Sequence, residues 1–100
     1  MKYSLDIRPD ALNDIEITAT WYEAKDPALG ADFIRIILNS IEAIPANPLM
    51  HRLRNRNGNV RWVLTPRFPN RIVYQVQDEL ITVFAVIHSA RHDRNWKERL

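Results

Sequence analysis

The chain of 100 residues contains no cysteine and two glycines, Gly30 and Gly58. The absence of cysteine excludes disulfide bonds, thiolate metal ligands and cysteine nucleophiles. Two isolated glycines cannot build the glycine-rich loop that cradles phosphates in nucleotide-binding proteins. The serines, at positions 4, 40 and 89, lack the flanking glycines of a nucleophile elbow. With no metal-binding or cofactor motif in the sequence, we expect neither a metal nor a cofactor.

Long apolar runs are absent as well. The N-terminal sequence MKYSLDIRPD has no apolar export segment, and no stretch approaches the ~20 apolar residues of a membrane-spanning helix. We therefore expect a cytoplasmic protein with no membrane partner. The hydrophobic fraction of 46% indicates a folded chain, and its length suits a single domain over residues 1–100.

Acidic residues are missing from the middle of the chain, where none occurs between Ala43 and Gln77. Up to Met50 the chain has four basic and eight acidic residues, a net charge of −4; from His51 onward it has ten and four, a net charge of +6. The arginines in the gap are Arg52, Arg54, Arg56, Arg61, Arg67 and Arg71. Guanidinium groups match phosphate oxygens, so this segregation favours an anionic partner. The alternative is a solvated loop and strand edge, with arginine stems covering apolar surface.

Hydrophobic periodicity predicts one strand and two helices in the first half. Tyr3, Leu5 and Ile7 alternate with polar residues, as in a strand with one buried face. Pro9 opens a helix that the Lys25-Asp26-Pro27 sequence ends. A second helix runs from about Pro27 to Ile44, and the short connection predicts an antiparallel helical hairpin.

The second half predicts strands. Residues 50–59 form a polar, arginine-rich loop in this interpretation, residues 60–64 and 71–76 are strands, and residues 77–79 are a turn. Residues 80–88 are apolar on both faces, which indicates a central strand, and residues 92–100 allow a short last helix. The fold class is therefore α+β, in the order β-α-α-β-β-β, with the hairpin packed on a small antiparallel sheet. The first strand is expected to pair with one from the C-terminal half.

His88, Arg91 and Trp96 are candidate functional residues after this central strand. A histidine can transfer protons near neutral pH, and a neighbouring arginine could hold a scissile phosphate. The commoner alternative is a hydrogen-bonded histidine at a strand end. Trp96 is most simply the core anchor of the last helix, and it is kept as a candidate contact for a target.

Several short motifs together resemble the RelE/ParE family of toxins. They are Trp21-Tyr22-Glu23, the Gly30–Phe33 and Phe68–Tyr74 segments, Ile81–His88, and then Arg91 and Trp96. The resemblance implies the toxin of a type II toxin–antitoxin, or plasmid stabilisation, system, which forms a hetero-oligomer with an antitoxin encoded beside it. RelE-type members cleave messenger RNA on the ribosome, and ParE-type members block DNA gyrase.

The resemblance also suggests roles for individual residues. Arg71 and Arg91 fall where RelE-type toxins keep phosphate-contacting arginines, so with His88 they are the catalytic candidates of an RNase. Where those toxins carry catalytic lysines, this chain has arginines, and Trp96 stands near the place of a tyrosine. These departures argue against RNase activity, and the helix endings and the His88–Trp96 tail resemble the ParE side more closely, so the resemblance favours a ParE-like gyrase inhibitor. The candidate target- or nucleic-acid-binding residues are Arg52, Arg54, Arg56, Arg61, Arg67 and Trp96. The alternatives are a ribosome-dependent endoribonuclease and an inactive module that only binds the antitoxin.

Overall fold

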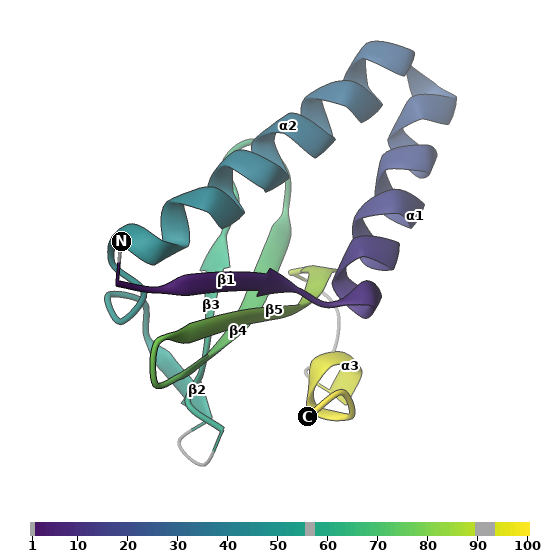
Figure 1. The fold of residues 1–100 in the computed structure, drawn as a ribbon. Helices are drawn as coiled ribbons and strands as arrows, with labels where there is room; N and C mark the ends of the chain where they lie inside the picture. Colours follow the sequence, from purple (N-terminus) through teal and green to yellow (C-terminus); the bar gives the residue numbers. More distant parts are fainter. Residues whose placement is uncertain (1, 56–57, 90–93) are drawn as a thin grey trace.

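The computed structural model describes residues 2–55, 58–89 and 94–100 and places a helical hairpin beside a mixed sheet (Figure 1). Its elements, in chain order, are β1 (Ser4–Ile7), α1 (Pro9–Lys25), α2 (Pro27–Ala43), a 3-10 turn (Ile44–Ala46), β2 (Leu53–Asn55), β3 (Val60–Leu64), β4 (Asn70–Gln77), β5 (Leu80–His88) and α3 (Arg94–Lys97). The α+β class and the helical hairpin are confirmed.

Proline and aspartate set the helix boundaries. Pro9 begins α1 and Pro27 begins α2, and the Asp26 side chain between them accepts a hydrogen bond from the backbone N–H of Ala28 at 3.0 Å. The two helices cross closely at Gly30, where an added Cβ would lie 2.9 Å from the Ala19 carbonyl oxygen. Only glycine fits this crossing without a shift of one helix.

The sheet has five strands in the order β1-β5-β4-β3-β2. β1 pairs with the C-terminal half, as predicted, but it runs parallel to β5, so the expectation of a purely antiparallel sheet is wrong. Two helices separate β1 from the other strands and provide the long crossover that a parallel pair requires. β5 is an interior strand between β1 and β4, but the middle strand is β4.

Strand β2 lies inside the segment predicted as a loop, and it pairs with β3 across an irregular register. Three residues are too few to show the alternation that identifies a strand in a sequence. The predicted last helix is shorter than expected, since α3 covers Arg94–Lys97. Its expected start at His92 lies outside the described residues.

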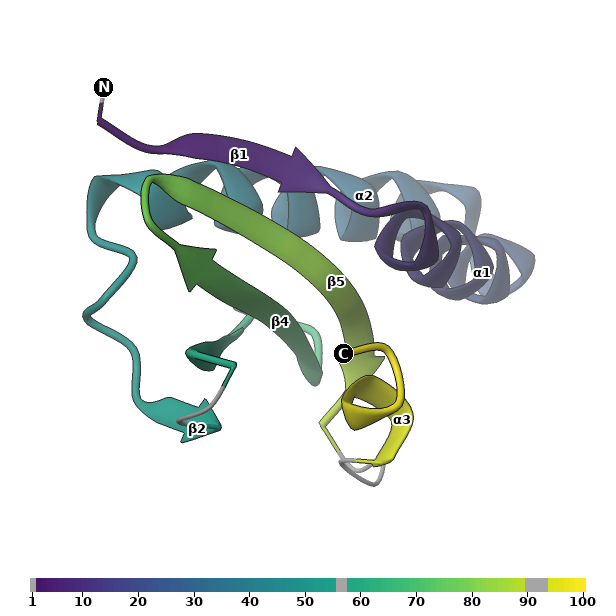
Figure 2. The same cartoon turned by 60° about the horizontal axis from the view of Figure 1, so that its bottom comes forward.

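The sheet separates two apolar clusters. The larger one fills the space between the helical hairpin and the sheet and includes Phe33, Ile37 and Tyr74. The smaller one lies on the opposite face, where Trp96 packs on Val73 and Phe84. Figure 2 shows α3 next to the C-terminal end of β5 and apart from α2. Both faces of β4 and β5 are therefore covered over much of their length.

Candidate functional site

The sheet face that carries α3 gathers two of the predicted arginines around a tryptophan. The guanidinium carbon of Arg54, on β2, lies 4.0 Å from the ring centroid of Trp62, on β3. The guanidinium carbon of Arg71, on β4, lies 4.4 Å from the same centroid. We call Arg54, Trp62 and Arg71 the arginine–tryptophan face. It joins two delocalised cations to an aromatic ring, a combination suited to binding anions and stacking on planar groups.

Packing holds this face in place. Arg71 is 6% exposed, and the Trp62 ring meets the buried Trp96 ring edge-on, with centroids 6.0 Å apart. Trp96 itself is 0% exposed, which agrees with its interpretation as the core anchor of α3. It therefore presents no side-chain surface to a target in this structure, and it acts on the face by supporting Trp62.

Two further predicted arginines bind within the protein. The Arg61 Nε donates a hydrogen bond to the His51 carbonyl oxygen at 2.9 Å, and its Nη1 donates to Asn59 Oδ1. The Arg67 Nη1 lies 2.9 Å from the carboxylate of Asp32 on α2, and this hydrogen bond lowers the pKa of Asp32. Both arginines link neighbouring segments of this chain.

The remaining predicted site residues are spread out or not described. Arg52 is exposed just before β2. Arg56 and Arg91 lie outside the described residues. Trp62 was not predicted as a site residue, because its neighbours Val63 and Leu64 suggest ordinary cross-strand packing. The sequence signal that could have identified it is its position in the middle of the arginine-rich segment.

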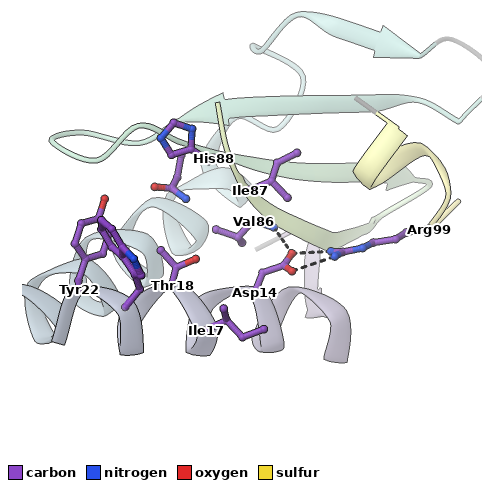
Figure 3. Close-up of a pocket in the computed structure, with 10 residues that line it drawn as sticks. Asp14, Ile17, Thr18, Tyr22, Val86, Ile87, His88 and Arg99 are labelled. Atoms are coloured by element: carbon purple, nitrogen blue, oxygen red, sulfur yellow. Dashed lines mark hydrogen bonds and ion pairs between the residues drawn. The ribbon is translucent and has the colours of Figure 1, made fainter. Parts of the chain in front are cut away.

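His88 lies on the other face of the sheet from Arg71. Side chains alternate along a strand, and Arg71 is paired with Ile87, which belongs to the cluster around Trp96. His88, the next residue, is paired with Asn70 and lines a groove against α1 (Figure 3). The structure therefore does not bring these two catalytic candidates together.

This α1–β5 groove is an open pocket of about 690 Å³ between helix α1 and the C-terminal half of β5. Its α1 wall includes Ile17, Thr18, Trp21 and Tyr22, and Asn70 and Val86 contribute from the sheet. Apart from His88, none of these positions was predicted as a site residue.

One end of the groove is closed by an ion pair between Asp14 and Arg99 (Figure 3). The two guanidinium nitrogens of Arg99 donate to the two carboxylate oxygens of Asp14 at 2.6 and 3.0 Å. Arg99 also donates to the Phe84 carbonyl oxygen, and Asp14 accepts from the Val86 backbone N–H. The hydrogen bond to Asp14 raises the pKa of Arg99. The pair links the segment after α3 to both α1 and β5.

Within the described ranges, no group of three or more His, Asp or Glu side chains is placed to hold a metal ion. None of the helices in those ranges combines the length and apolarity needed to cross a bilayer.

Three solved structures with the same fold come from toxin–antitoxin systems. The chromosomal ParDE toxin–antitoxin system of P. aeruginosa aligns with a TM-score of 0.77 at 19% identity, covering 87% of this chain and 96% of that one. The isolated RelE toxin of E. coli aligns with a TM-score of 0.64 at 18% identity, covering 97% and 95% of the two chains. A mutant E. coli RelE in complex with an antitoxin RelB peptide gives 0.62 at 21% identity, covering 100% and 96%.

The sequence identifies the family directly. None of the curated proteins matches the chain. The sequence model described as "ParE toxin of type II toxin-antitoxin system, parDE" matches residues 5–93, which is most of the chain and includes α1, α2 and strands β2 to β5 in full. The chain therefore belongs to the ParE toxin family of type II toxin–antitoxin systems.

Proposed function

We propose that this protein is an active toxin that arrests growth by inhibiting DNA gyrase and is neutralised by an antitoxin encoded beside it. The family to which the chain belongs supports the toxin–antitoxin role. The choice of gyrase over the ribosome depends on one observation, the placement of His88 and Arg71 on opposite faces of the sheet.

An RNase needs both residues in one place. A general base must come within hydrogen-bond reach of the proton it removes, about 3 Å, while a cation stabilises the adjacent phosphate. His88 lies in the groove on the α1 side of the sheet and the arginine–tryptophan face lies on the other side, which does not favour their acting on one phosphodiester. An inhibitor that only binds its target has no such requirement.

The arginine–tryptophan face is the surface we assign to target binding. Arg54 is exposed, whereas Arg71 is almost fully buried, so Arg54 is the residue that a partner reaches first. A cationic face near an anionic target accelerates association and is sensitive to salt. We expect Arg54→Ala to weaken growth inhibition. Arg35→Ala is a matched control, because Arg35 is an exposed arginine on α2 whose partner is Asp32.

Ribosome-dependent messenger RNA cleavage is the second candidate, and the same face favours it. An aromatic ring can stack on a base, and guanidinium groups can hold phosphates. In that case Arg71→Ala should slow cleavage by on the order of 10²-fold, as for other preorganised donors.

Inducible expression in a susceptible bacterium separates the candidates. Gyrase inhibition predicts filamentation and DNA-damage signalling with intact messenger RNA. Cuts within codons on ribosomes, with DNA supercoiling unchanged, would assign the protein to the RNase branch. Normal growth despite soluble, folded protein would leave an inactive antitoxin-binding module.

A further inference from the structure

The connection between α2 and β2 contains a turn, residues 47–51, that side chains of the sheet hold at two points. The buried phenol of Tyr74, on β4, donates a hydrogen bond to the Pro48 carbonyl oxygen at 2.6 Å. The Nε of Arg61, on β3, donates to the His51 carbonyl oxygen at 2.9 Å. Because both anchors are backbone carbonyls, the path of the 47–51 turn is fixed whatever its own side chains contact.

Between these anchors the turn displays apolar side chains to solvent. The Met50 N–H donates to the Asn47 carbonyl oxygen at 3.3 Å, which closes the turn, and Leu49 and Met50 are 52% and 64% exposed. Leu53, on β2, is 37% exposed and lies on the same side of the sheet, because the strand register places it in line with Tyr74. We call Leu49, Met50 and Leu53 the turn cluster. Apolar side chains gathered on a preorganised backbone are suited to the centre of an interface.

The border of the turn cluster is basic. Arg52 and Arg54 flank Leu53 and are exposed, and the sequence has no acidic residue between Ala43 and Gln77. A symmetric contact between two copies of this chain would bring these arginines together, and the repulsion between like charges opposes it. The charge pattern instead matches a partner whose apolar pocket is bordered by carboxylates.

The turn cluster is continuous with the surface assigned above to target binding. Leu53 is followed on β2 by Arg54, which belongs to the arginine–tryptophan face. β2 is the last strand of the sheet and lies away from α1, so one partner at this edge reaches the arginine–tryptophan face and the turn cluster together (Figures 1 and 2).

We propose that the turn cluster is the apolar centre of the surface with which the toxin binds its protein target, and that the target contributes an apolar pocket bordered by acidic side chains. This assignment depends on the proposed function, in which the toxin acts by binding a protein.

The test measures inhibition of purified gyrase and growth arrest by the full chain. Leu49→Ser combined with Met50→Ser should raise the toxin concentration needed for half-inhibition by about 30-fold or more, as for the loss of central interface residues. Leu12→Ser is the matched control, because Leu12 is a leucine of similar exposure, 50%, on α1. It should change inhibition by less than about threefold, as for surface residues outside an interface. Thermal unfolding of each variant verifies that it folds.

Salt distinguishes the apolar centre from its basic border. Arg52→Ala should weaken inhibition at low salt and have little effect at high salt, because salt screens the attraction between exposed charges. The loss caused by the double serine variant should be the same at both salt concentrations, since apolar contacts are not screened.

Wild-type inhibition and growth arrest by the folded double variant would overturn the turn cluster as the target-binding surface, and so would an equal loss in Leu12→Ser. Normal inhibition together with a lost affinity for the antitoxin would assign the cluster to the antitoxin and would also overturn it. If the wild-type protein stops growth without inhibiting gyrase, gyrase is the wrong target. Growth arrest by the double variant then decides the surface: retained arrest overturns the turn cluster, and lost arrest supports it for a different target.

Discussion

Replacing Arg99 by alanine should destabilise the protein by about 2 kcal/mol. The Arg99 and Asp14 side chains are 25% and 13% exposed, so their pair lies between two known cases. Exposed pairs contribute about 0–1 kcal/mol, and removing one partner of a fully buried pair costs about 3–5 kcal/mol. Arg99→Ala also leaves the Phe84 carbonyl oxygen without its donor. For a domain of this size the expected loss lowers the melting temperature by about 10 °C.

Thermal unfolding followed by circular dichroism tests this expectation, with Arg35→Ala as the control. The pair of Arg35 with Asp32 is more exposed, at 60% and 36%, so the control should shift stability by less than about 1 kcal/mol. The folded-state pKa of Arg99 is raised, so its contribution is complete below the unfolded pKa and is lost only at strongly alkaline pH. The difference in stability between wild type and Arg99→Ala should therefore be the same at pH 7 and pH 9. Equal melting temperatures for the two variants would refute the reasoning.

Three other substitutions test the packing. Tyr74→Phe should cost about 1–2 kcal/mol in a denaturant titration, because burial raises the pKa of Tyr74 to about 12 and its phenol donates to the Pro48 carbonyl oxygen at 2.6 Å. Gly30→Ala should cost about 1–3 kcal/mol in the same titration, since its Cβ would press on Ala19. Burial lowers the pKa of His51. The wild type should therefore lose stability as the pH falls below about 6.5, whereas His51→Gln should not show this loss. Parallel pH–stability curves for the two proteins would contradict the assignment.

The helices were predictable because local chemistry determines them. Pro9 and Pro27 fix the starts of α1 and α2, and apolar spacing identifies the buried Phe33, Ile37 and Ile41 of α2. On α1 the spacing is a poorer guide, since Leu12 is exposed. Strands β3, β4 and β5 carry clear β-branched patterns. β2 escaped prediction because its three residues show no alternation, and the parallel pairing of β1 was missed because strand direction depends on a partner more than seventy residues away, from Ser4 to Leu80.

The candidate site was predictable only in part. The arginine-rich segment indicated a cationic surface, and Arg54 and Arg71 do meet on one face. The sequence could not show that Arg67 pairs with Asp32 on α2, nor that Asp14 and Arg99 meet across a separation of 85 positions. The sequence carries no local signal for such pairs. Each acidic side chain could pair with many basic ones, and only the folded structure determines which two meet.

The most direct test of the account is a supercoiling assay with purified DNA gyrase, relaxed plasmid and this protein. The account predicts that the wild-type toxin blocks supercoiling, that Arg54→Ala is weaker while Arg35→Ala is not, and that the co-purified antitoxin restores activity. Unimpaired supercoiling at toxin concentrations that stop growth, together with cleavage of messenger RNA on programmed ribosomes, would contradict it.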